Sequence, residues 1–93
     1  MSDHVQLEID EGIARLELDR PDKHNALSIN LIDALNDAIG TVERHDGLRV
    51  VILGGRGRSF CAGMDLQGVL DDAEAMSGML KGLSIAMRRL RRL

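Results

Sequence analysis

The fold depends on residues 49–63, which read RVVILGGRGRSFCAG. Its first part, Arg49-Val50-Val51-Ile52-Leu53, is a short apolar run rich in β-branched residues, the pattern of a strand buried on both faces. The glycines that follow it indicate a loop. We therefore predict that residues 49–53 form the central strand of a sheet, flanked by a hairpin and covered by two helices, and that a glycine-rich loop follows.

The residues before this run predict a hairpin and a helix. Apolar and polar residues alternate over residues 5–10 and again over residues 13–18, with Glu11-Gly12 between the two runs. Two alternating runs around a glycine turn indicate a β-hairpin with one buried face. Ser28 is a favourable N-cap, and apolar residues at helical spacing predict an amphipathic helix over residues 29–44.

Apolar residues three and four apart predict one long helix, or two abutting ones, from about Asp65 onward. The apolar positions are Leu66, Leu70, Ala73, Met76, Leu80, Leu83, Met87 and Leu90. We expect this stripe to face the core. Arg88, Arg89, Arg91 and Arg92 gather at the C-terminal end, where cations complement the helix macrodipole, and we interpret them as a solvated cluster.

Composition restricts the class of protein. A chain of 93 residues is one domain at most, with a small core. The formal charge of -3 and the single aromatic residue, Phe60, offer little to phosphate backbones or to bases, which argues against a nucleic-acid partner. Cys61 is the only cysteine, and no signal peptide or membrane-spanning apolar run is present. We expect a soluble, cytoplasmic protein that does not bind a membrane.

Two motifs point to a family. The first is RPDKHNALS at residues 20–28, and the second is GRSFCAGMDL at residues 57–66. In this order, with a VVIL strand between them, they resemble the N-terminal half of the crotonase (enoyl-CoA hydratase/isomerase) superfamily. The resemblance implies an α+β fold (α/β by some schemes), namely a partial crotonase-like ββα spiral with a hairpin plus a buried strand covered by two helices.

The same resemblance implies a lyase or isomerase that acts on acyl-CoA thioesters, as in fatty acid metabolism. The commonest reactions add water to an enoyl-CoA or move its double bond. Dehalogenases and hydrolases share both motifs, so the reaction stays open. No cofactor is implied, because coenzyme A is part of the substrate, and no metal is implied either. The full-length parent is expected to be a homo-oligomer.

By this resemblance, the backbone N–H of Met64 donates to the thioester carbonyl oxygen and forms half of an oxyanion hole. When the substrate becomes an enolate, this oxygen gains charge, and a fixed amide at a helix N-terminus stabilises it. Gly63 allows the backbone to approach the ligand. We further expect Asp65 to cap the following helix and the Met64 side chain to line the acyl pocket.

Substrate-binding residues are expected in both motifs. In the first, the backbone near Ala26 is implied to reach the adenine and pantetheine, with Lys23 near the phosphates. The full set of candidates is Lys23, His24, Ala26, Ala62, Gly63, Asp65 and Leu66.

Some of these loop residues have simpler interpretations. Asn25 and Ser28 are explained equally well as caps of the following helix. Cys61 could be a nucleophile, but no histidine has a spacing that implies pairing with it, so we interpret it as a small packed residue.

The resemblance also implies that the second oxyanion donor and the proton-moving carboxylates lie beyond residue 93. We therefore expect residues 1–93 to be the N-terminal part of a crotonase-like domain, truncated before the second oxyanion-hole segment. The isolated chain should then be inactive, because one donor without an acid or base lacks most of the catalytic apparatus. The alternative is a non-catalytic module that binds acyl-CoA or oligomerises.

Overall fold

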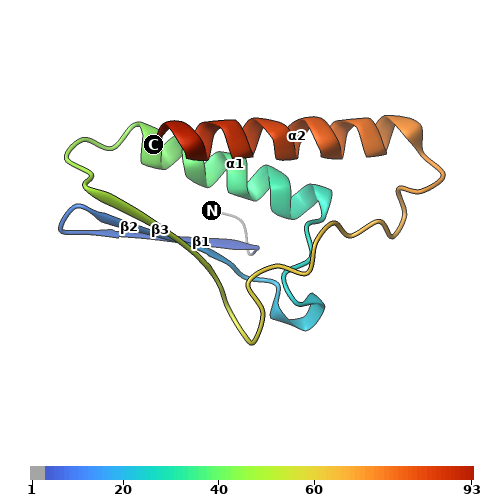
Figure 1. The fold of residues 1–93 in the computed structure, drawn as a ribbon, viewed down its shortest axis with the longest axis horizontal. Coiled ribbons are helices and arrows are strands. Elements are labelled where there is room, and N and C mark those ends of the chain that lie inside the picture. The colour runs from blue at the N-terminus through green and yellow to red at the C-terminus, as the bar shows by residue number, and fades with distance from the viewer. Residues whose placement is uncertain (1–3) are drawn as a thin grey trace.

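The computed structural model describes residues 4–93 and shows an α+β arrangement, as the sequence predicts (Figure 1). The elements in chain order are β1 (Val5–Asp10), β2 (Ile13–Leu18), a 3-10 turn η1 (Pro21–Lys23), α1 (Ile29–Glu43), β3 (Val50–Gly55) and α2 (Ala73–Arg92). Both helices lie on the same side of the three-stranded sheet. α1 packs on the hairpin strands, and α2 packs on α1.

The predicted hairpin is confirmed. β1 and β2 pair antiparallel in a register that places Leu7 opposite Leu16. The two turn residues have positive φ, 50° at Glu11 and 81° at Gly12. A two-residue turn of this kind matches the twist of the flanking strands, and glycine adopts its second position without steric cost.

The predicted position of β3 in the sheet is wrong. The strand order is β1-β2-β3, so β2 is central and β3 is an edge strand that pairs parallel to β2. Val50 is 50% exposed and Ile52 is 45% exposed, whereas Leu16 on β2 is fully buried. The apolar run is therefore a strand with one face toward the core, because no described residue covers the face that carries Val50 and Ile52.

α1 follows the prediction closely. Its N-cap is Ser28, whose Oγ accepts a hydrogen bond of 3.1 Å from the N–H of Leu31. The helix buries one apolar face against the sheet and α2, and it ends at Glu43, one residue before the predicted end. The buried apolar residues of this face are Leu31, Ile32, Ala34, Leu35, Ala38, Ile39 and Val42.

The second helix begins later than predicted. α2 starts after Asp72, whose Oδ1 accepts a hydrogen bond of 3.0 Å from the N–H of Ala75. Residues 65–72 are not helical: residues 67–71 form turns, and Gly68 has a φ of 82°, which a right-handed helix excludes. The apolar spacing continues through these turns, so periodicity alone extended the helix too far.

The apolar stripe of α2 is only partly core. Met79 and Ala86 are buried, and Leu83 and Leu90 pack at the edge of the core. Leu80 and Met87, which we expected to be core, are 50% and 56% exposed. α2 contacts α1 along the line of Met79, Gly82 and Ala86, and Leu80 and Met87 lie to the side of this line.

Arg89 does not belong to a solvated cluster. Its Nη2 and Nε atoms donate to the two carboxylate oxygens of Glu43, at 2.7 and 3.0 Å, and its Nη1 donates to the carbonyl of Asn36 at 3.1 Å. Asn36 in turn donates from Nδ2 to the carbonyl of Gly82 at 3.0 Å. A bidentate arginine–carboxylate pair is specific in geometry, so this contact helps to set how α2 lies on α1.

Acid should weaken the contact between Glu43 and Arg89. Hydrogen bonds from the Arg89 guanidinium hold the pKa of Glu43 below its usual 4.5. Because the folded-state pKa is the lower one, the stabilisation is complete above about pH 4.5 and is lost as the pH falls through the folded-state pKa. We expect the melting temperature to fall over this range, and to fall less in Glu43→Gln. An identical decrease in both proteins, measured by circular dichroism, would contradict this expectation.

None of the helices within residues 4–93 is both long enough and apolar enough to cross a membrane.

Candidate functional site

The two motif loops lie side by side. Leu27 and Met64 form an isolated parallel β-bridge. The N–H of Leu27 donates to the carbonyl of Gly63 at 2.7 Å, and the N–H of Asp65 donates to the carbonyl of Leu27 at 2.9 Å. The bridge therefore fixes the backbone on both sides of Met64 against the first motif, although the two segments are far apart in the sequence.

The N–H of Met64 is available to a ligand. It belongs to the same trans peptide as the carbonyl of Gly63, which faces Leu27, so the N–H points away from Leu27. Within the described residues this N–H has no hydrogen-bond partner. The expected helix N-terminus is wrong, however, because the residues that follow form turns and α2 begins only at Ala73.

The side chain of Met64 packs inward. It lies against a small apolar cluster formed by Ile32, Val69 and Met79. This cluster brings together side chains from α1, from the turn at Val69 and from the first half of α2. The packing holds the Met64 backbone from the side-chain direction, and a role of this side chain in an acyl pocket stays a prediction.

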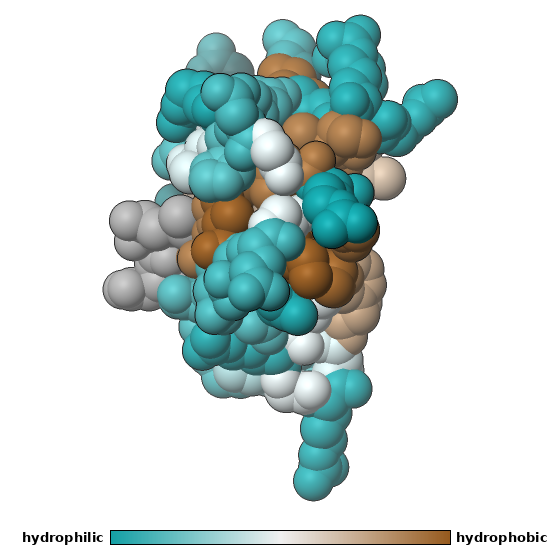
Figure 2. All heavy atoms as spheres, turned by 90° about the vertical axis from the view of Figure 1, so that its left-hand side faces the viewer, coloured by the Kyte–Doolittle hydropathy of each residue, from teal (hydrophilic) through white to brown (hydrophobic). Residues whose placement is uncertain are grey.

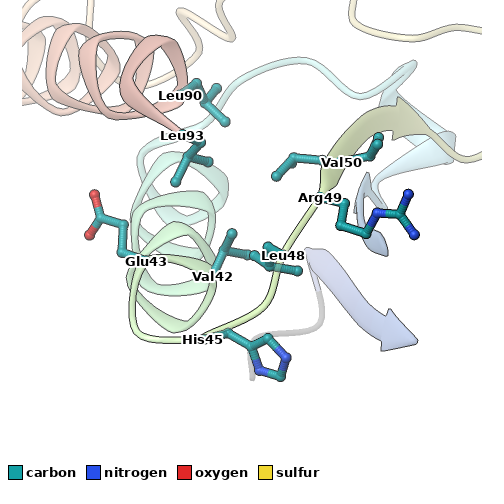
Figure 3. Close-up of a pocket in the computed structure, with 9 residues that line it drawn as sticks. Val42, Glu43, His45, Leu48, Arg49, Val50, Leu90 and Leu93 are labelled. Atoms are coloured by element: carbon teal, nitrogen blue, oxygen red, sulfur yellow. The ribbon is translucent and has the colours of Figure 1, made fainter. Parts of the chain in front are cut away.

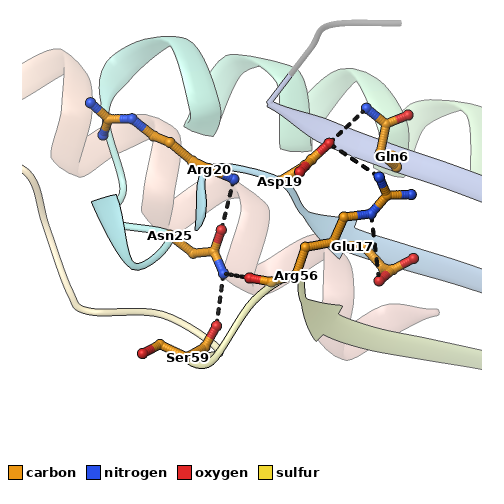
Figure 4. A network of polar contacts seen from close by, with 7 residues as sticks. All are labelled: Gln6, Glu17, Asp19, Arg20, Asn25, Arg56 and Ser59. Atoms are coloured by element: carbon orange, nitrogen blue, oxygen red, sulfur yellow. Dashed lines mark hydrogen bonds and ion pairs between the residues drawn. The ribbon is translucent and has the colours of Figure 1, made fainter. Parts of the chain in front are cut away.

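Asn25 connects the two loops and is completely buried (Figure 4). Its Oδ1 accepts a hydrogen bond of 2.7 Å from the N–H of Arg20, and its Nδ2 donates to the carbonyls of Arg56 and Ser59, at 2.9 and 2.8 Å. We call these three hydrogen bonds the Asn25 network. They show that Asn25 does not cap α1, which is the work of Ser28 alone.

Gly55 makes room for the Asn25 network. A Cβ atom at this position would overlap the carbonyl oxygen of Phe60, and it would lie 2.7 Å from Nδ2 of Asn25 and 2.9 Å from the carbonyl oxygen of Ser59. The last residue of β3 must therefore be glycine for the loop to fold back on Asn25.

Arg20 joins the loops a second time. Its Nη1 donates to the carbonyl of Ala26 at 3.0 Å and to Oδ2 of Asp65 at 2.9 Å. The hydrogen bond from the N–H of Gln67, and then that from Arg20, lower the pKa of Asp65 below its usual range. Asp65 is thus an anion that ties the loops together, and the expectation that it caps the following helix is wrong, since Asp72 does so.

The remaining candidates of the first motif lie on the surface. Lys23 ends η1 and is exposed, and His24 follows it with a φ of 51°. The Nδ1 of His24 lies 3.5 Å from Oγ of Ser59, at the upper limit of a hydrogen bond. Ala26 is half-buried, and its N–H is bonded to the carbonyl of Lys23.

The remaining candidates of the second motif flank Met64. Ala62 and Gly63 are exposed, and Leu66 is partly exposed. Gly63 has a φ of 97°, a conformation that favours glycine, so its conformational freedom is needed here. Cys61 packs against the main core, and its Sγ accepts a hydrogen bond of 3.4 Å from the N–H of Gly63. This confirms its interpretation as a small packed residue.

One surface pocket adjoins the predicted site, and a second lies at the other end of the molecule. A pocket of about 350 Å³ adjoins the β-bridge, and Met64 and Ala26 do not line it; its walls are Ser28, Ile29, Asn30, Asp65, Gln67, Gly68, Val69 and Met79. The expected cleft shared by Met64 and Ala26 therefore stays a prediction.

Among residues 4–93, no three histidine, cysteine, aspartate or glutamate side chains gather as a metal site requires.

The second pocket, of about 370 Å³, lies at the other end of the molecule, between the C-terminal ends of α1 and α2 and the start of β3 (Figure 3). Its apolar walls include Val42, Leu48, Leu90 and Leu93, and the Glu43 side chain points away from it. Apolar side chains are visible between polar ones on this end of the molecule (Figure 2). No predicted site residue lines this pocket.

Comparison with known proteins agrees with this arrangement. The family model for enoyl-CoA hydratase/isomerase matches residues 8–88. A probable enoyl-CoA hydratase, echA6, of Mycobacterium leprae is 43% identical over 61 residues, which are 62% of this chain and 25% of the relative. Hydroxycinnamoyl-CoA hydratase-lyase of Pseudomonas fluorescens is 35% identical over 88 residues, which are 95% of this chain and 30% of the relative.

A solved structure shows the same fold. An enoyl-CoA hydratase/carnithine racemase from Magnetospirillum magneticum superposes with a TM-score of 0.85 at 29% identity, over 98% of this chain and 36% of that one. The chain thus spans about a quarter to a third of the length of the curated relatives it matches. Because the family model covers most of the sequence, the chain belongs to the enoyl-CoA hydratase/isomerase family.

Proposed function

We propose that this protein binds the thioester group of an acyl-CoA at the β-bridge, with the N–H of Met64 as one donor of an oxyanion hole. The observation that supports this most directly is the N–H of Met64, which has no hydrogen-bond partner within residues 4–93 and points away from Leu27, on a backbone held by two hydrogen bonds to Leu27. A donor fixed in this way needs no reorganisation when a carbonyl oxygen becomes an enolate oxygen, so it favours the transition state over the ground state.

The rest of the ligand would extend along the first motif. In this proposal the backbone near Ala26 contacts the adenine and the pantetheine, and the exposed ammonium of Lys23 lies near the phosphates. His24 borders the same surface. Coenzyme A is then part of the substrate, and no separate cofactor is needed.

The reaction class that fits is the addition of water to an enoyl-CoA or the movement of its double bond. Both reactions need a second oxyanion donor and a carboxylate that moves a proton. We propose that residues 1–93 supply only the first donor, so that the isolated chain binds acyl-CoA without turnover and the complete site requires further parts of a homo-oligomeric parent. The alternative is a module that binds acyl-CoA or oligomerises and has no catalytic role.

Met64→Pro should weaken the binding of crotonyl-CoA and leave that of coenzyme A unchanged. Proline removes the N–H of Met64, whereas the two hydrogen bonds of the bridge use other atoms. A net hydrogen bond of about 0.5–1.5 kcal/mol corresponds to a decrease in affinity of about 2- to 10-fold. Isothermal titration calorimetry with both ligands measures the difference, and Met64→Leu, which keeps the N–H, is the control.

The outcomes separate the candidate functions. An equal loss of affinity for both ligands in Met64→Pro would remove the oxyanion role. Saturable consumption of crotonyl-CoA by the isolated chain, followed by loss of enoyl absorbance, would contradict its proposed inactivity. Binding of neither ligand by the wild-type chain would leave oligomerisation as the remaining alternative, to be measured by sedimentation.

A further inference from the structure

We propose that Asn25 is a positioning residue for the acyl-CoA site: it fixes the loop that carries Met64 at a set distance from the loop that carries Ala26. This inference rests on the proposed function, because it concerns a ligand that contacts both loops. Asn25 itself is completely buried and cannot touch the ligand. It acts through its hydrogen bonds to backbone groups of the two loops.

The partners of Asn25 are backbone groups in two separate segments. On one side it accepts from the N–H of Arg20, which precedes η1. On the other side it donates to the carbonyls of Arg56 and Ser59, which lie between β3 and Met64. One amide side chain thus satisfies three backbone groups, and none of the three needs a particular side chain.

Two further features fix the distance between the loop that carries Met64 and the loop that carries Ala26. The side chain of Arg56 lies 3.5 Å from the Asp19 carboxylate and 3.8 Å from that of Glu17, which keeps its carbonyl near the end of β2 (Figure 4). Arg20 reaches Asp65, the residue directly after Met64. Met64 is therefore held between Ser59 upstream and Asp65 downstream, and both contacts lead back to the first motif.

The backbone conformation explains why asparagine occupies this position. Asn25 has a φ of 58°, a left-handed conformation that costs most residues free energy and that asparagine and glycine adopt more readily. Asn25→Gly is therefore compatible with the backbone conformation; it removes the side-chain hydrogen bonds and leaves the volume of the buried side chain empty. Ser28→Ala is the matched control, because it removes the N-cap of α1 and contacts neither carbonyl of the second loop.

The first test needs no ligand. In the wild-type protein, the Nδ2 hydrogens of Asn25 should exchange slowly by NMR, because they are buried and bonded. In Asn25→Gly the bridge amides of Leu27 and Asp65 should exchange at least about tenfold faster than in Ser28→Ala, since the loops are no longer tied together. Free exchange of the Asn25 side-chain amide in the wild type, or unchanged bridge amides in the folded variant, would overturn the proposal.

The second test uses ligands that contact one loop or both. In the proposed mode, adenosine 3′,5′-bisphosphate contacts only the first loop, whereas crotonyl-CoA contacts both. Asn25→Gly should therefore lower the calorimetric affinity for crotonyl-CoA about 2- to 10-fold more than that for the bisphosphate, the effect of about one hydrogen bond. In Ser28→Ala both affinities should change equally.

Equal losses in Asn25→Gly would show a merely structural role and overturn the inference. If the wild-type chain binds neither compound, the proposed function fails, and with it the role of Asn25 toward a ligand. The exchange measurement then still decides whether Asn25 holds the two loops together, so the two failures are distinguishable.

Discussion

Leu16→Ala should lower the free energy of unfolding by about 2–5 kcal/mol, the cost of a cavity at a fully buried leucine. Leu16 lies on β2, the central strand, between Leu7 of β1 and Leu53 of β3. Its side chain belongs to the main core beneath α1. Few positions in this chain combine complete burial with neighbours on both adjacent strands, so we expect this to be among the most destabilising alanine substitutions.

Ile52→Ala is the matched control, since it removes apolar carbons from the neighbouring strand β3. Ile52 is 45% exposed and faces away from α1, so the expected cost is below about 1 kcal/mol. Urea unfolding of both variants, followed by circular dichroism, measures the difference. Equal costs at the two positions would mean that β3 is buried on both faces in solution, contrary to the exposure of Val50 and Ile52 described above.

Asn25→Asp should be destabilising by about 3–5 kcal/mol at neutral pH, from two unsatisfied carbonyls and an unpaired buried charge. The carboxylate cannot donate, so the carbonyls of Arg56 and Ser59 would lose their partner and face a negative oxygen instead. The hydrogen bond from the N–H of Arg20 would persist. The net effect is therefore dominated by the second loop.

The effect of Asn25→Asp should depend on pH in a defined direction. Burial and the two carbonyls raise the pKa of the new carboxyl group in the folded state, and its protonated form can again donate one hydrogen bond. The difference from the wild type should therefore shrink as the pH falls below the folded-state pKa. Asn30→Asp, the same change at an exposed position, should show no such loss. Chemical unfolding of both variants at several pH values makes this comparison.

Several elements could be predicted from the sequence because local interactions determine them. The hairpin follows from two alternating runs and a turn whose second residue is glycine. α1 follows from its apolar face and from Ser28, whose cap involves a residue three positions away. The family follows from two motifs that lie within residues 20–28 and 57–66. The hairpin and α1 depend on contacts between residues that are close in the sequence. The family assignment depends on the order of residues within the two motifs.

The errors concern features that neighbouring residues do not decide. An apolar run such as Val50 to Leu53 has the same composition whether it is central or at an edge, and only the pairing with β2 distinguishes the two. The apolar spacing of α2 continues into residues 65–72, where Gly68 and the cap at Asp72 end the helical backbone. Leu80 and Met87 are exposed because they lie to the side of the line along which α2 contacts α1.

The candidate site shows the same division. The sequence by itself determined the family and the two motif loops, because the order and type of the motif residues identify them, and the family resemblance makes Met64 the candidate donor. Only the tertiary structure decided that the Met64 N–H has no partner in the part of the chain that the structure describes, that Arg20 reaches Asp65 and that Asn25 joins the loops. These contacts join residues 31 to 45 positions apart, and no local pattern records such pairings, since they exist only after the chain has folded.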